Sequence, residues 1–369
     1  MKKRTLATIL TAALLGCSLC ACGSDGGSSA ATTAAAVAAP AAEGQTEGGN
    51  AAAADLPKMT LSIGHNNNSD SLMNYVAEQM KAKLEEKSGG NLTVNIYPSG
   101  QLGSESDMVT SCQEGDLTFL ISGLHALVNN VPETSIVNLP FMFDNVEQAR
   151  KTFADETVRK ELNAGFEKSN MKLVLLADQG FRCLSTNKEI TGPDSFKGLN
   201  IRTLTNQDQV EAWKMLGTNP TPIDFSELYL SLQQGVIDSQ ENPYDIIDTN
   251  KFYEVQKYFT NSNHIYHTIS VNIGTSTYDS MPAEYQKMID ETCAEVEQMA
   301  FDECDKKLDS YKNNLINNGM EFIDFDEIDG MREALAERTS GMIDIVKNTV
   351  NNEVLVDAFL AAAEAAKAE

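Results

Sequence analysis

The sequence predicts an α/β fold with two packed domains, and three observations support this. From residue 58 onward, short apolar segments of strand character alternate with segments of helical period, which is typical of parallel sheets flanked by helices. The chain has 369 residues, more than one small domain usually holds, and 42% of them are hydrophobic. A long helical pattern near the end exceeds the width of one small domain and could brace two.

The first half of the globular part has a clear order of strands and helices. Predicted strands cover residues 59–63, 92–96, 117–121 and 171–177. Apolar residues four apart from Leu72 to Leu84 indicate a helix between the first two strands. Ser104 predicts the N-cap of a further short helix, and Asp144 with Glu147 predicts a capping box ahead of another.

The second half of the globular part also contains predicted strands and helices. A strand is predicted at 199–203, helices at 207–216 and 225–236, and a strand at 264–275 that could carry the chain back to the first domain. Pro282 suits the first position of a helix that ends near Gly319. A helix of about 37 residues would be about 55 Å long.

The N-terminus has the pattern of a bacterial signal peptide. Residues 2–4 are basic, and 5–15 are an apolar run too short to span a bilayer. We therefore expect residues 1–21 to be removed and the mature protein to lie outside the cytoplasm.

The segment Leu19-Cys20-Ala21-Cys22 resembles the lipobox of bacterial lipoproteins. It predicts that Cys22 becomes a diacylated N-terminus on the outer face of the cytoplasmic membrane. Cys17 is a second candidate for this position, and an ordinary cleaved signal peptide is the alternative. Residues 22–56 would then form the lipid anchor and a linker, since Gly, Ser, Ala and Thr dominate them and cannot build a core.

The charge of the chain excludes several partners. It has 28 Lys and Arg against 53 Asp and Glu, so it repels nucleic acid and anionic lipid headgroups. The membrane would be reached only through the lipid anchor. An anionic solute would also be repelled unless positive charge is concentrated in one site. The few arginines are Arg4, Arg150, Arg159, Arg182, Arg202, Arg332 and Arg338.

Neither a metal nor a cofactor is expected. The spacing of Cys112, Cys183, Cys293 and Cys304 suggests neither a disulfide framework nor a zinc site. His264 and His267 would face opposite sides of a strand, so they do not predict a metal pair. The sequence contains no G-x-S-x-G, H-E-x-x-H or P-loop motif, so we predict no catalytic residue and no enzyme. A secreted lipoprotein hydrolase remains the enzyme alternative.

Six segments together resemble the solute-binding proteins of TRAP (tripartite ATP-independent periplasmic) transporters, DctP type. They are 97–103, 138–143, 198–202, 225–235, 238–243 and 252–258, in the order and spacing of that family. The resemblance implies a two-lobed periplasmic-binding-protein-like fold with a central ligand cleft, hinge strands and a long helix spanning both lobes. The expected lobes are 57–180 with 268–307, and 181–267 with 308–369, the latter including the C-terminal helices.

The resemblance also implies a function. Such proteins capture small organic acids outside the cytoplasm and deliver them to a permease with a small and a large membrane subunit. C4-dicarboxylates and sugar acids such as uronates remain open as solutes. Sialic acid is less expected, because sialic-acid binders of this family carry an acid and an arginine where this chain has Gly123 and Ala126. A receptor that presents a carboxylate to a sensor kinase is the alternative.

Four binding residues follow from the matched motifs. The resemblance implies that Arg202, in Gly-Leu-Asn-Ile-Arg, pairs with the solute carboxylate, and that Arg182 is a second arginine of the cleft. It also places Asn242, of Gln-Glu-Asn-Pro, and Asn66, in the loop after the first strand, in the cleft. A guanidinium suits the task because it donates two parallel hydrogen bonds and stays charged when buried.

Other interpretations of these residues stay open. An arginine of an acidic protein often forms a surface ion pair, and an asparagine before Pro243 often makes only a turn. Gln233 and Glu241 are further candidates for ligand contact that the sequence leaves undecided.

Overall fold

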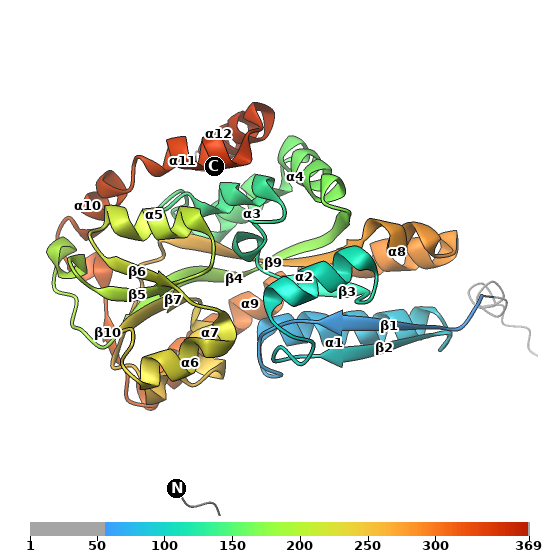
Figure 1. Ribbon diagram of the computed structural model, residues 1–369, viewed down its shortest axis with the longest axis horizontal. Coiled ribbons are helices and arrows are strands. Elements are labelled where there is room, and N and C mark those ends of the chain that lie inside the picture. Colours follow the sequence, from blue (N-terminus) through green and yellow to red (C-terminus); the bar gives the residue numbers. More distant parts are fainter. Residues whose placement is uncertain (1–55, 368–369) are drawn as a thin grey trace, which may run out of the picture. The chain divides into compact units, whose positions relative to one another are not determined.

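The computed structural model describes residues 56–367 (Figure 1). The predicted signal peptide, both candidate cysteines and nearly all of the linker lie outside the described residues. Within 56–367, none of the helices combines the length and apolar character that crossing a membrane requires.

Ten strands form one sheet, with the order β2-β1-β3-β9-β4-β7-β5-β6, while β8 joins β4 and β10 joins β8. Their bounds are β1 Met59–Gly64, β2 Leu92–Tyr97, β3 Phe119–Ser122, β4 Met171–Thr186, β5 Asn200–Thr203, β6 Asn219–Pro222, β7 Ser239–Asn242, β8 Tyr258–Thr260, β9 Ile265–Gly274 and β10 Glu321–Ile323. The sheet is mixed, whereas alternation alone predicted a parallel one. β1 is parallel to β2 and β3, but β4 and β9 run antiparallel to their neighbours because β9 returns the chain to the first half.

Twelve α-helices among the described residues flank this sheet. They are α1 Leu72–Lys87, α2 Glu105–Glu114, α3 Val146–Ala154, α4 Glu156–Lys168, α5 Gln207–Met215, α6 Phe225–Gln233, α7 Tyr244–Thr249, α8 Thr275–Ser280, α9 Ala283–Asn317, α10 Met331–Arg338, α11 Met342–Val350 and α12 Glu353–Lys367. Ser104 caps α2 in a capping box with Asp107, as its type predicts. The cap of α3 is Asn145, which accepts from the backbone N–H of Gln148, so the predicted Asp144–Glu147 pair is wrong by one residue.

Strand β4 connects the two halves of the sheet. It pairs with β9 as far as Arg182 and Ile265, and from Cys183 onward it pairs with β7. The register shifts just before this point, where Gly180 has φ +76°, a conformation that favours glycine. We call the part built on β1, β2, β3 and β9 the first lobe, and the part built on β5, β6, β7, β8 and β10 the second lobe. Arg182 therefore lies on the strand that crosses between them.

Helix α9 spans both lobes, as predicted. It has 35 residues and a length of about 52 Å. Its residues from Tyr285 to Cys304 pack into an apolar cluster with β1, β2 and α1, and Leu315 packs into a separate cluster beneath α6 and α7. The helix therefore contributes side chains to the apolar cores of both lobes.

The expected lobe assignment gave 308–369 to the second lobe, but the last helix packs on the first. Phe359 of α12 contacts Phe143 and also Phe153 of α3 (Figure 1), whereas Met342 of α11 lies in an apolar cluster that also includes Ala212 of α5, in the second lobe. The periodicity of a helix identifies its apolar face, but it does not identify the surface that this face covers.

Candidate functional site: a polar cavity at the crossing strands

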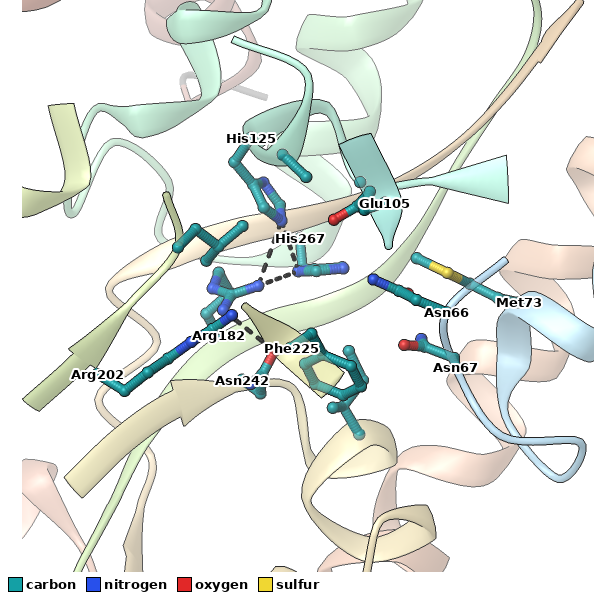
Figure 2. Close-up of a pocket in the computed structure, with 14 residues that line it drawn as sticks. Asn66, Asn67, Met73, Glu105, His125, Arg182, Arg202, Phe225, Asn242 and His267 are labelled. Atoms are coloured by element: carbon teal, nitrogen blue, oxygen red, sulfur yellow. Dashed lines mark hydrogen bonds between the residues drawn. The ribbon is translucent and has the colours of Figure 1, made fainter. Parts of the chain in front are cut away.

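A polar cavity lies where β4 crosses between the lobes (Figure 2). It is lined by Asn66, Asn67, Met73, Glu105, Gly123, His125, Ala126, Arg182, Arg202, Leu204, Phe225, Asn242, Ile246 and His267. These residues come from both lobes. The structure therefore brings Arg202, Arg182, Asn242 and Asn66, the four main predictions, to one place.

Arg182 is buried and has a complete set of partners inside the protein. Its exposed fraction is 1%. Its Nε and Nη2 donate to the two carboxylate oxygens of Glu241, with Nη2 2.7 Å from Oε1. Nη2 also donates to Oδ1 of Asn242 at 3.1 Å, and Nη1 lies 2.7 Å from Nδ1 of His267. The charge of Arg182 is thus neutralised before any solute arrives.

Glu241, one of the two further candidates for ligand contact, is buried against Arg182 and is not among the residues that line the cavity. Burial alone would raise the pKa of Glu241, but the charge of Arg182 and hydrogen bonds from Arg182 and His264 lower it to about 2. Nε2 of His264 lies 3.1 Å from the carboxylate. Glu241 thus orients Arg182 and neutralises its charge. A sequence motif does not distinguish this role from ligand binding.

Arg202 differs from Arg182 in having no such counter-charge. It lies on β5, is 3% exposed, and its Nε donates to the carbonyl of Ile223 at 2.8 Å. Among the described residues, no carboxylate lies within ion-pair distance of it. Burial and the neighbouring charge of Arg182 lower the pKa of Arg202 to about 10, so it remains cationic at neutral pH. A buried unpaired cation is costly, and an incoming carboxylate would relieve that cost.

Two histidines beside Arg182 are site residues that the sequence did not reveal. Nε2 of His125 lies 2.9 Å from Nδ1 of His267, and both rings are buried. Burial, together with the charge of Arg182, holds the pKa of each well below its usual value, so both are neutral. His125 and His267 are 142 residues apart in the sequence, so no local motif indicates that they meet. In the sequence, His267 is notable only for its spacing from His264, which does not predict a metal pair.

Gly123 makes room for these rings. A Cβ there would lie 2.8 Å from Nε2 of His125 and 3.3 Å from Nε2 of His267. A longer side chain at this position, such as the acid that the resemblance implies for sialic-acid binders, would therefore require the histidine rings to move.

The rest of the lining mixes polar and apolar side chains. Oδ1 of Asn242 accepts from Arg182, and its Nδ2 donates to Gln240 at 2.6 Å. Nδ2 of Asn67 is buried without a partner. Glu105, the first residue of α2, accepts a hydrogen bond from the hydroxyl of Ser122, and Figure 2 shows it on the side of the cavity opposite Arg202. Burial raises the pKa of Glu105.

The cavity is narrow. Its volume is about 40 Å³, against roughly 10–15 Å³ for one water molecule. A wider hollow of about 490 Å³ adjoins it and shares Asn66, Glu105 and Phe225. A carboxylate with a few further atoms fits the cavity, whereas a six-carbon acid must extend toward the hollow or part the lobes.

Gln233, the other further candidate for ligand contact, does not line this cavity. It is exposed at the C-terminal end of α6 and borders a separate surface hollow with Tyr229 and Gly235. Phe225, at the other end of the same helix, reaches the cavity instead. Two turns of helix separate these residues, and only the orientation of α6 decides which of them meets the solute.

The lobes also touch through Asp245, which supports a prediction about stability. This residue of α7 is buried, and its Oδ2 accepts from the backbone N–H of Leu72 at the start of α1, at 3.0 Å, and from the amide of Gln179. Burial raises the pKa of Asp245 to about 6 despite these hydrogen bonds. The folded carboxylate therefore binds a proton more readily than the unfolded one, so this group lowers stability above about pH 6 and the penalty disappears as the pH falls toward 3.8.

We expect Asp245→Asn to raise the free energy of unfolding at pH 7 by about 1–3 kcal/mol, because the amide keeps an acceptor without the charge. Urea unfolding at pH 7 and pH 4 checks this, and the gain should largely vanish at the lower pH. Asp70→Asn, which removes an exposed carboxylate near the same helix start, is the control and should change stability by under about 0.5 kcal/mol. An equal gain for Asp245→Asn at both pH values would contradict the electrostatic explanation.

Solved structures with this fold include two-lobed periplasmic solute-binding proteins of TRAP transporters. One from Haemophilus influenzae RdAW, with bound L-gulonate, has a TM-score of 0.77 and 27% identity, covering 83% of this chain and 99% of the other. Another from Anaerococcus prevotii, with bound D-glucuronate, has a TM-score of 0.78 and 25% identity, covering 84% and 99%.

The model of bacterial extracellular solute-binding protein family 7 (DctP) matches residues 63–344, and the chain belongs to this family. The 2,3-diketo-L-gulonate-binding periplasmic protein YiaO of Escherichia coli is 26% identical over 287 residues, 78% of this chain and 82% of the relative. The resemblance found in the sequence motifs is thereby confirmed. The protein is an extracytoplasmic transport protein that binds a substrate and is not an enzyme.

Proposed function

We propose that this protein captures a small organic acid, either a C4-dicarboxylate or a sugar acid such as a uronate, and delivers it to the small and large membrane subunits of a TRAP permease. The observation that carries the proposal is Arg202, a buried cation that lines the cavity without a carboxylate partner among the described residues. Relatives with bound L-gulonate and D-glucuronate support an acid as the solute. The acidic chain excludes nucleic acid as a partner.

The binding step follows from the contacts. The solute carboxylate meets Arg202, which can donate two parallel hydrogen bonds to it. Arg182 adds positive potential, but Glu241 holds its position and takes most of its hydrogen bonds. Asn66 and Asn242 line the same cavity from opposite lobes, so a solute that touches both favours lobe closure.

The anchoring is part of the same proposal. Cys22, or Cys17 in its place, would carry two acyl chains and hold the domain at the outer face of the cytoplasmic membrane. A linker of about 30 residues spans roughly 30 Å as a flexible coil, enough to reach a permease in the same membrane.

The ligand prediction is tested with a panel of dicarboxylates, uronates, aldonates and amino acids. At about 100 times its dissociation constant, a true ligand should raise the free energy of unfolding by about 2.7 kcal/mol. Thermal unfolding screens the panel, and calorimetry measures the affinity. The ligand should be recovered unchanged after incubation, since turnover would indicate a hydrolase. Stabilisation by none of the acids would contradict the proposed function.

A further inference from the structure

We propose that Glu105 makes this pocket selective for acids with one carboxylate and several hydroxyl groups, and that it disfavours dicarboxylates. The inference rests on the proposed function, because it assumes that Arg202 receives the solute carboxylate. It narrows the two solute classes that the motifs and the relatives leave open.

The first argument is a charge count of the cavity. The ionisable side chains among its lining residues are Glu105, His125, Arg182, Arg202 and His267. Both histidines are neutral, and Arg182 is already balanced by Glu241. Arg202, a cation, and Glu105, a carboxyl group whose pKa burial raises, remain without an ion-pair partner among the described residues. With Glu105 ionised, the empty site is close to neutral, so a solute with one carboxylate brings it to a net charge of about −1 and a second carboxylate would bring it to about −2.

The second argument is the geometry of Glu105. Ser122 donates to its Oε1, and the structure gives Oε2 no hydrogen-bond partner among the described residues. Figure 2 shows the carboxylate facing the cavity from the side opposite Arg202. An ionised carboxylate only accepts hydrogen bonds, so the far end of the solute must offer donors. A hydroxyl does so, whereas a second carboxylate would place two like charges together in a site with little water.

The third argument concerns two buried polar atoms of residues that line the cavity. Nε2 of His267 and Nδ2 of Asn67 have no hydrogen-bond partner, and these residues are 3% and 2% exposed. In Figure 2 the His267 ring extends toward Asn66 across the cavity. A hydroxyl both donates and accepts, so a polyhydroxylated solute can satisfy these atoms and Glu105 together.

An amino acid is the competing ligand, because a carboxylate and an ammonium would also match Arg202 and Glu105. An ammonium group only donates, however, and so it would leave Nδ2 of Asn67, itself a donor, unpaired. The observations therefore favour hydroxyl groups over an ammonium group.

The test uses matched pairs of acids that differ only in the oxidation of C6: gluconate with glucarate, and galactonate with galactarate. Calorimetry on the purified protein should give at least one pair in which the monoacid binds more than about tenfold tighter than the diacid. In Glu105→Gln we expect that ratio to fall below about threefold, mainly because the diacid binds better. The variant keeps an acceptor for Ser122, and an unchanged unfolding temperature without ligand verifies its fold.

Glu227→Gln is the matched control. Glu227 is an exposed carboxylate of α6 and lines neither the cavity nor the adjoining hollow. Its removal should leave the ratio unchanged, so an equal loss of selectivity would overturn the role of Glu105. The proposal also fails if the diacid binds as well as the monoacid, if Glu105→Gln keeps the ratio, or if an amino acid binds tightest. Binding of no acid at all would instead refute the proposed function.

Discussion

Arg202→Ala is expected to abolish stabilisation by the solute while leaving the unliganded protein as stable as before, or more stable. The guanidinium is buried without a carboxylate partner among the described residues, so it contributes little to the unliganded fold. In the complex it would form the main charge-assisted contact, and loss of one partner of a buried pair costs about 2–5 kcal/mol of binding free energy. Calorimetry and urea unfolding of the same preparations measure the two effects separately.

Two further variants sharpen this test. Arg202→Lys keeps the charge but loses the two parallel donors, so its affinity should fall between those of the wild type and the alanine variant. Arg338→Ala removes a partly exposed arginine that pairs with Asp194, remote from the cavity, and should leave binding unchanged. Full affinity in Arg202→Ala would remove the central residue of the proposed function.

Glu241→Gln, in contrast to Arg202→Ala, should cause a large loss of stability in the unliganded protein. The substitution leaves the charge of Arg182 buried without its counter-ion, which costs about 3–5 kcal/mol of unfolding free energy. The low pKa of Glu241 fixes the sign of the pH dependence: its contribution is fully present above about pH 4.5 and is lost as the pH falls toward 2. Denaturant unfolding at pH 7 and at pH 3 should therefore show a smaller difference between variant and wild type at pH 3.

The surface variant Glu321→Gln is the control for this prediction. Glu321 is exposed and lies 3.3 Å from Lys257, and pairs of that kind contribute about 0–1 kcal/mol. Adding Arg182→Met to Glu241→Gln should recover part of the lost stability, because the uncompensated charge is then gone. If Glu241→Gln were no more harmful than the surface variant, the buried pair would have no structural role.

The two arginines illustrate what local sequence can and cannot predict. Both were predicted from their motifs, and both reach the cavity. Their different states depend on Glu241, which is 59 residues from Arg182 and meets it only because β7 pairs with β4. A pairing between strands so far apart in the chain leaves no periodic signal in the sequence. The sequence therefore could not show that Arg182 is paired within the protein and Arg202 is not.

The fold shows the same difference between what local sequence predicts and what long-range contacts decide. Hydrophobic periodicity is a local property, and it was enough to predict the alternating strands and helices, the long helix that begins after Pro282 and the α/β class. Packing decided the direction of β9, the position of α12 against α3, the contact between His125 and His267, and the absence of Gln233 from the cavity lining. Packing depends on contacts between segments far apart in the chain, and these contacts form only when the chain folds.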